Sequence, residues 1–262
     1  MLPFPHWSYS KLQTWLRCPA LFRFRYIEEA EAESVSMALL LGSAIHGAVS
    51  FVHSKRFQGH PLAVEHVLES FRVQMRLAVE KAGVPVSYPK GHPDAESSLE
   101  LGEKMLRCYY EEVVGGKTVA LEQELRAPLQ KRDGGETSLP LLGYVDRIVD
   151  KDGGLVVIKL KTSARAWSQG DVDLSTQISS YALLMNAAGY ENCRFRYEIL
   201  TKTKTPKLQI LETRRTERDM DRLVDQFLSL ERAVEADVYP RNESSMTCCG
   251  CEFKRCCGVF SG

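Results

Sequence analysis

The chain has 262 residues, of which 44% are hydrophobic, and its 34 basic side chains balance 34 acidic ones. A formal net charge of zero argues against a protein that coats nucleic acid by bulk charge, although it is compatible with a local basic groove. The sequence has no run of 18 apolar residues, and no basic segment followed by an apolar one at its start. We therefore expect no membrane span, no secretory signal, a cytoplasmic location, and one sizeable core with a smaller lobe.

The first predicted element is a short helix near the N-terminus. Ser8 or Ser10 is the expected N-cap, because a serine side chain accepts a hydrogen bond from the first helical turn. The apolar residues that follow keep helical spacing: Leu12, Trp15 and Leu16. Pro19 interrupts this helix and disfavours the helical conformation for Cys18, which holds that sulfur near a turn. By itself, an isolated cysteine is more often a small buried hydrophobe than a ligand.

Helical patterns then dominate the chain up to about residue 113. A helix predicted over residues 37–54 contains His46, and a lone histidine on an apolar helix is more often a hydrogen-bonded core residue than a ligand. Two further helical segments are predicted over residues 61–82 and 96–113, around a proline-rich break. We interpret this region as a helical insertion that flanks a substrate channel.

A β-hairpin is predicted over residues 143–162, with its turn at Asp152-Gly153-Gly154. Asp146 then lies on the first strand, and Lys159 and Lys161 lie on the second. Side chains repeat every two residues along a strand, so the two lysines face the same side, toward whatever Asp146 faces. Two neighbouring lysines on an otherwise apolar strand usually mark a site.

The loop after this hairpin contains an exposed cation and an aromatic residue, Arg165 and Trp167. They either contact phosphate and base or merely close the loop. A helix predicted over residues 175–188 places Gln177 and Tyr181 on one face, because they are four residues apart. Further strands are predicted over residues 117–128, 193–200 and 207–212.

The C-terminal part combines an amphipathic helix, predicted over residues 216–238, with a run of cysteines. Five of the eight cysteines lie between Cys248 and Cys257, which favours metal ligation in a reducing compartment over a secreted disulfide framework. Two ligand sets compete, and both contain Cys248 and Cys251, followed by either Cys256 or Cys257. Thiolate sites of this kind suit zinc as well as an iron–sulfur cluster.

Taken together, these motifs resemble the PD-(D/E)XK nuclease superfamily, specifically its RecB-like branch with an iron–sulfur cluster. The branch's Gly-x-(Ile/Val)-Asp-Arg strand and (Asp/Glu)-x-Lys-Thr strand match Gly143, Val145, Asp146, Arg147, Lys161 and Thr162. The Leu-Gly-x-x-x-His segment matches residues 41–46, and the Gln-x-x-x-Tyr motif matches residues 177–181. Residues 8–19 are similar to the way such iron–sulfur proteins begin. The resemblance covers roughly residues 8–257. Within the branch, the chain is similar to the CRISPR-associated and AddB-type nucleases.

The resemblance implies an α/β fold: a restriction-endonuclease-like mixed central sheet flanked by helices, with a helical N-terminal insertion and an iron–sulfur-stapled C-terminus. It divides one compact unit into an N-terminal helix with the first cluster ligand (1–30), a helical lobe (31–115), a nuclease core (116–212), and a C-terminal helix with the cysteine cluster (213–262). The implied reaction is hydrolysis of phosphodiester bonds in DNA, by an exonuclease that acts on single strands. The implied partners are single-stranded DNA or DNA ends and, for the CRISPR-associated version, an integrase.

Two metal sites are also implied by the resemblance. Mg²⁺ or Mn²⁺ would be held by His46, Asp146, the backbone carbonyl of Leu160 and an acidic residue at position 159, with Lys161 orienting or activating a water. Gln177 and Tyr181 would hold the DNA strand in register. The ligands of a 4Fe-4S cluster would be Cys18, Cys248, Cys251 and Cys257, so that the cluster joins the two ends of the chain.

Lys159 departs from the family pattern, because it stands where the second metal-binding carboxylate is expected. An ammonium group at roughly 4 Å repels a divalent cation by several kcal/mol even with an effective dielectric constant of about 20. Lys159 would instead pair with Asp146 and fill the metal's place, so metal binding and cleavage are predicted to be poor. Two other functions are considered: a non-catalytic DNA-end binding subunit built on the nuclease fold, and a zinc-stabilised adaptor with no nucleic-acid role.

Overall fold

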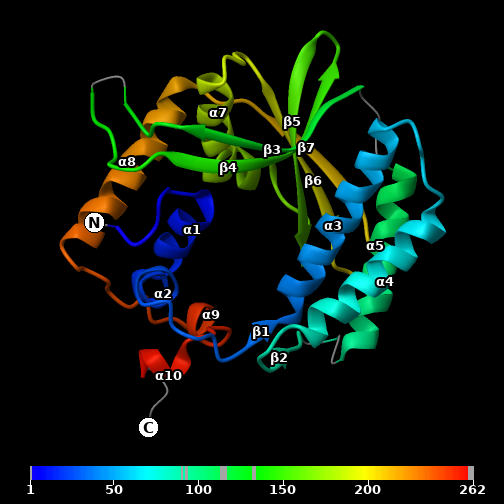
Figure 1. Ribbon diagram of the computed structural model, residues 1–262, viewed down its shortest axis with the longest axis horizontal. Helices are drawn as coiled ribbons and strands as arrows, with labels where there is room; N and C mark the ends of the chain where they lie inside the picture. Colours follow the sequence, from blue (N-terminus) through cyan, green and yellow to red (C-terminus); the bar gives the residue numbers. More distant parts are fainter. Residues whose placement is uncertain (1, 90, 92–93, 113–116, 132–133, 259–262) are drawn as a thin grey trace.

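The computed structural model describes residues 2–258 except 90, 92–93, 113–116 and 132–133. Its centre is a five-stranded sheet with the strand order β3-β4-β5-β6-β7 (Figure 1). The strands are β3 (Lys117–Ala127), β4 (Leu141–Lys151), β5 (Gly154–Ser163), β6 (Arg194–Thr201) and β7 (Leu208–Thr213). Neighbouring strands are antiparallel, except that β5 and β6 are parallel. The expected mixed sheet is confirmed.

Local sequence explains the connections within this sheet. β4 and β5 form the predicted hairpin, whose turn places Asp152 and Gly153 at φ values of 56° and 73°. This left-handed region is the one that tight hairpin turns need. The parallel step from β5 to β6 requires a longer connection, which α6 (Gln169–Asp173) and α7 (Thr176–Ala187) supply.

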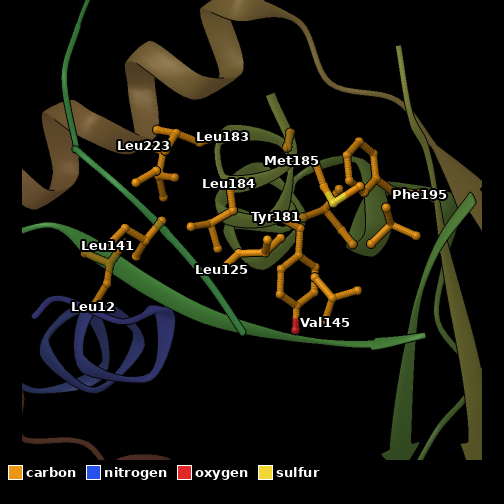
Figure 2. Packing of buried hydrophobic residues seen from close by; sticks show 14 of the residues in the cluster. Leu12, Leu125, Leu141, Val145, Tyr181, Leu183, Leu184, Met185, Phe195 and Leu223 are labelled. Atoms are coloured by element: carbon orange, nitrogen blue, oxygen red, sulfur yellow. The ribbon is translucent and has the colours of Figure 1, made fainter. Parts of the chain in front are cut away.

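Helices cover both faces of the sheet (Figure 1). Besides α6 and α7 they include α1 (Tyr9–Arg17), α3 (Met37–Phe57), α4 (Val64–Glu80), α5 (Ala95–Glu112) and α8 (Glu217–Glu235). α1, α7 and α8 enclose one apolar cluster with the sheet, whereas α3, α4 and α5 enclose a second one. Figure 2 shows part of the first cluster, in which Tyr181 and Leu184 of α7 and Leu223 of α8 lie with Leu141 and Val145 of β4.

Strand β5 contributes side chains to both clusters by simple alternation. Val157 belongs to the cluster around α7, and Leu160 belongs to the cluster around α3. Successive side chains on a strand point to opposite faces, so Lys159 and Lys161 share the face of Val157, on the side of α7 and α1. The sequence pattern predicted that the two lysines share a side, and the fold identifies that side.

Helix α3 lies in the core. Its 21 residues are long and apolar enough to cross a membrane by length and composition alone, with a mean hydropathy of 1.4. Eight of its side chains are buried, among them Ile45, Val49 and His53, and the helix packs on α4, α5, β3 and β5. This is the packing of a core helix and not that of a membrane span.

The two ends of the chain meet beside the sheet (Figure 1). The elements there are α2 (Pro19–Phe22), a π-helical turn (Arg23–Ile27), α9 (Ser245–Cys248) and α10 (Lys254–Cys257), with the two-stranded parallel pair β1 (Val35–Ser36) and β2 (Val86–Ser87) nearby. The Asn242 side-chain amide donates to the Arg17 carbonyl at 2.8 Å, and the Glu33 N–H donates to the Glu252 carbonyl at 2.8 Å. Protein contacts alone therefore join segments that are more than 200 residues apart in sequence.

The predicted helices and strands are confirmed to within a few residues. Ser8 is the N-cap of α1, and its hydroxyl accepts from the Lys11 N–H at 3.3 Å. The predicted end, at residue 113, of the helix expected over residues 96–113 lies outside the described residues. Helix α6 was not predicted. It begins in the loop after β5, with a capping box between Ser168 and Asp171. In such a box each side chain satisfies a backbone N–H of the first helical turn.

Candidate active site

The hydrogen-bonded pairing of strands β4 and β5 stops at the candidate site. Their pairing ends at Arg147 and Ile158, one residue before Asp146 and Lys159. The Leu160 N–H, which an intact ladder would pair with a carbonyl, instead donates to Asp146 Oδ2 at 3.0 Å. The carboxylate of Asp146 therefore sits in the fork between the two strands, and it is only 13% exposed.

Lys159 fills the rest of this fork. Its Nζ atom lies 2.5 Å from Asp146 Oδ1, and its side chain is 14% exposed. The pair is thus short and largely removed from water, which strengthens the attraction between the two charges. Both oxygens of Asp146 are engaged by groups of the protein itself.

Helix α3 brings His46 to the same place. Its Nε2 lies 2.9 Å from the Leu160 carbonyl, and its Nδ1 lies 3.6 Å from Asp146 Oδ2. Burial holds the pKa of His46 below its ordinary value, so the ring is neutral at pH 7 and donates from Nε2. Gly42 permits this approach, because a Cβ there would stand 3.3 Å from Thr162 Oγ1 at the end of β5.

The fold therefore brings together the three donors predicted for a divalent cation: His46, Asp146 and the Leu160 carbonyl. Each of them already has a protein partner, and Lys159 places an ammonium group against the carboxylate. Among the described residues, no group of three His, Cys, Asp or Glu side chains is arranged to hold a metal ion. The residues present do not fit Mg²⁺ or Mn²⁺ in the implied arrangement, because Lys159 supplies a cation of its own.

Lys161 lies on the same face of β5, under the N-terminal helix. Its Nζ atom lies 5.8 Å from the centroid of the Tyr9 ring, within the range of a cation–π contact. Burial, reinforced by the neighbouring charge of Lys159, lowers the pKa of Lys161 to about 8. Lys161 is therefore still mostly protonated at pH 7.

A groove runs past Lys159, between α1, β4 and α7. Lys161 is not part of its lining, which consists of His6, Ser8, Tyr9, Ser10, Leu142, Gly143, Tyr144, Lys159, Gln177, Ser180, Tyr181 and Leu184. The two residues of the Gln-x-x-x-Tyr motif are fixed in its wall, since the Tyr181 hydroxyl donates to the Tyr144 carbonyl at 3.0 Å and the Tyr197 hydroxyl donates to Gln177 Oε1 at 3.3 Å. Gly143 allows α7 to lie this close, because a Cβ there would stand 2.6 Å from Leu184 Cδ1.

Arg165 and Trp167 make contacts that close their own loop. Arg165 forms two hydrogen bonds of 3.0 Å with the Asp171 carboxylate, and the Trp167 indole N–H donates to Ser163 Oγ at 3.1 Å. The Trp167 ring also packs edge-on against Tyr197. Neither residue lines the groove, so these contacts favour the loop-closing role, and a contact with DNA remains a prediction for both.

A buried ring of polar side chains lies behind the site, and sequence reasoning missed it. The Arg147 guanidinium donates to Glu198 Oε1 at 2.8 Å and lies 3.0 Å from His53 Nδ1. His53 Nε2 lies 2.8 Å from the Tyr109 hydroxyl, which donates to Glu198 Oε2 at 2.6 Å. Burial, and then the charge of Arg147, lower the pKa of His53 to about 3, so His53 is neutral, with Nδ1 as acceptor and Nε2–H as donor. The ring ties α3 and α5 to β4 and β6, directly beside Asp146.

The four thiols predicted to bind a cluster line one pocket where the chain ends meet. Its cysteines are Cys18, Cys248, Cys251 and Cys257. The Asn242 N–H donates to Cys18 Sγ at 3.5 Å, a contact that would stabilise a thiolate. Cys249 and Cys256 are exposed and do not line the pocket. Cys257, unlike the competing Cys256, lines the pocket with the other three thiols, and Leu21, Phe24 and Lys254 also contribute to its lining.

Comparisons with known proteins bear on the family and the fold of the chain. A model of the PD-(D/E)XK nuclease superfamily matches residues 6–258. The fold is similar to a crystal structure described as "Putative exonuclease" from Eubacterium rectale, with 14% sequence identity, a TM-score of 0.55, and coverage of 91% of this chain and 85% of that chain.

The chain also aligns with the structure of a protein called SSO0001, with 13% identity, a TM-score of 0.35, and coverage of 94% of this chain and 91% of that chain. No match was found among curated proteins. The family match spans nearly the whole chain, including the hairpin, α3, the groove and the cysteine pocket. This protein therefore belongs to the PD-(D/E)XK nuclease superfamily.

Proposed function

We propose that this chain is a DNA exonuclease of the RecB-like type that acts on single strands, and that Lys159 impairs its hydrolysis. The observation that supports the proposal is that Asp146 and His46 both contact Leu160 at the fork between β4 and β5, beside the groove, with Lys161 as the next residue of β5. The single DNA strand would bind in this groove. Gln177 and Tyr181 are held in its wall by hydrogen bonds, so they can position a strand without first losing side-chain freedom.

Each residue of the site has a role in this proposal. Lys161 faces the scissile phosphate with an ammonium group and stabilises the negative charge that develops there. Asp146 is the acid that nucleases of this superfamily use with Mg²⁺ or Mn²⁺, but here it is neutralised by Lys159. The protein therefore retains the strand-binding parts of a nuclease and lacks a free ligand set for the ion.

The test is a comparison of substrates. End-labelled single-stranded and blunt duplex DNA of the same sequence are incubated with the full chain and Mn²⁺, and binding and cleavage are both measured. We expect single strands to bind at least about tenfold more tightly than the duplex, because the rings of Tyr9 and Tyr144 in the groove lining can stack on unpaired bases. We also expect only slow shortening from the strand ends. Equal affinity for both DNAs, or no binding at all, contradicts the proposed substrate.

A second function is favoured by one observation, the short ion pair between Lys159 and Asp146. It suggests a non-catalytic subunit that binds DNA ends and uses the nuclease fold as a scaffold. The two functions separate in the variant Lys159→Asp. Tight binding of single strands without cleavage, even by that variant, supports the non-catalytic subunit. A role beside a CRISPR integrase or in DNA repair fits either function.

We also propose that Cys18, Cys248, Cys251 and Cys257 hold a 4Fe-4S cluster, which would add covalent links where the chain ends already meet. Anaerobically purified protein is expected to be brown, with broad absorbance at about 400 nm and about four iron atoms per chain. Cys251→Ser is expected to remove both signals, because a tetrahedral thiolate site loses one of its ligands. The matched control Cys249→Ser should retain them, since that thiol is exposed and outside the pocket. A colourless protein containing zinc would contradict the cluster.

A further inference from the structure

We propose that Lys159 and Lys161 form a binding site for a backbone phosphodiester of single-stranded DNA, and that this site works without a divalent cation. The inference rests on the proposed function and makes it more specific, because it assigns the ligand class and the metal requirement of the same groove. It follows from the mismatch between the residues present and the ion that the superfamily usually uses.

Lys159 and Lys161 lie on the face of β5 that looks toward α7 and α1. Lys159 lines the groove together with Gln177, Ser180 and Tyr181. An ammonium group has three N–H donors, and the bond to Asp146 takes one of them, so donors remain for a ligand in the groove. A phosphodiester that follows the groove would pass within reach of this group.

At the fork, Asp146 contributes one carboxylate, whereas Lys159 and Lys161 contribute two lysine side chains on one face of β5. An acidic residue at position 159 would make the same site negative by one charge, and it would repel a phosphate until a cation bound. The lysine thus reverses the sign of the site.

The two lysines are partly shielded from water and held in place by the protein. The Lys159 and Asp146 side chains are 14% and 13% exposed, so the remaining positive charge acts in a medium that screens it less than water does. Lys161 is held under the ring of Tyr9, whose hydroxyl is itself fixed by a 2.7 Å hydrogen bond to Gln13. Both cations are therefore positioned before a strand arrives, which reduces the entropy cost of binding.

The experiment measures binding of a fluorescently labelled single-stranded oligonucleotide by anisotropy. The full chain is titrated in EDTA and in Mg²⁺ at matched ionic strength. We expect the two dissociation constants to agree within about twofold, because the site supplies its own cations. Lys159→Gln should weaken binding by about tenfold and lower the slope of log affinity against log salt by about one, as expected for one phosphate contact.

Three variants make the result specific. Lys104→Gln is the matched control, since Lys104 is an exposed lysine on α5 that does not line the groove, and it should bind as the unmodified chain does. Lys159→Arg should retain EDTA-resistant binding because it keeps the charge. Lys159→Asp should bind the strand only when Mg²⁺ or Ca²⁺ is added. Thermal unfolding of each variant verifies that it is folded.

The outcomes separate the inference from the proposed function. Binding that disappears in EDTA, or an affinity of Lys159→Gln equal to that of Lys104→Gln, overturns the metal-independent site while leaving single-strand binding intact. An unmodified chain that binds no single strand in either buffer overturns the proposed function itself. Resistance to EDTA combined with a loss specific to Lys159→Gln supports the inference.

Discussion

Replacing Lys159 by aspartate is expected to turn this chain into an active Mn²⁺-dependent nuclease, with single-strand cleavage faster by at least about 10²-fold. The change removes an ammonium group that lies 2.5 Å from Asp146 Oδ1 and adds a second carboxylate beside it. Asp146, the new acid, His46 and the Leu160 carbonyl would then form the oxygen-rich donor set that Mg²⁺ and Mn²⁺ prefer. Charge stabilisation by a bound metal is worth several kcal/mol, and each 1.4 kcal/mol or so is a factor of ten in rate.

Two controls identify the cause of such a gain. Lys159→Gln removes the positive charge without adding a ligand, so it should gain much less than the aspartate variant. Lys161→Ala in the Lys159→Asp background should remove most of the gain, because Lys161 is proposed to stabilise the charge on the phosphate. Cleavage is measured on end-labelled single strands with Mn²⁺ and with EDTA. Unchanged cleavage by Lys159→Asp would mean that the second ligand comes from elsewhere or that the site is not catalytic.

Breaking the buried polar ring is expected to lower the free energy of unfolding by about 3–5 kcal/mol. The change is Glu198→Ala, which leaves the Arg147 guanidinium without its carboxylate in a place where Arg147 is 6% and Glu198 is 1% exposed. It also removes the acceptor of the Tyr109 hydroxyl. The stability of the unmodified and altered chains is compared by urea denaturation, on protein prepared in the same way.

The exposed ion pair between Glu65 and Arg107 provides the matched control, since Glu65→Ala removes a carboxylate from an arginine on the surface of the same helical lobe. Surface pairs contribute at most about 1 kcal/mol, so this variant should be nearly as stable as the unmodified chain. Equal stabilities for Glu198→Ala and Glu65→Ala would contradict the view that the ring fastens the lobe to the sheet.

The fold was predictable wherever the information was local. Alternation and a glycine turn defined the β4–β5 hairpin, serine capping defined the start of α1, and the Gln177–Tyr181 spacing defined one face of α7. The pairing of Asp146 with Lys159 was predicted from the family resemblance, because Lys159 stands where a metal-binding carboxylate is expected.

The fork between β4 and β5 was not predictable, because a hairpin pattern indicates continued pairing and does not show where it stops. The polar ring was also hidden, since Arg147 lies 94 residues from His53 and 51 residues from Glu198. One signal was present: His53 follows His46 by two helical turns, which places both on the same side of α3. Without the sheet, nothing in the sequence showed what that side of the helix meets.

The N-terminal wall of the groove was missed for a similar reason. The sequence indicated only a helix N-cap at Ser8 or Ser10. The groove lining brings these two serines and His6 together with Tyr181 of α7. Arg165 shows the opposite case. Its charge and its position after β5 left two roles open, a DNA contact or closure of the loop, and the sequence did not reveal its acidic partner six residues away, Asp171.

We infer that the ammonium group of Lys159 stands in the place of the divalent cation. A Mn²⁺ titration followed by electron paramagnetic resonance, on the unmodified chain and on Lys159→Asp, measures this exchange. We expect no site-bound Mn²⁺ for the unmodified chain and at least one bound ion for the variant. Binding of Mn²⁺ to the unmodified chain with the affinity of the variant, abolished in both by Asp146→Asn, would contradict it.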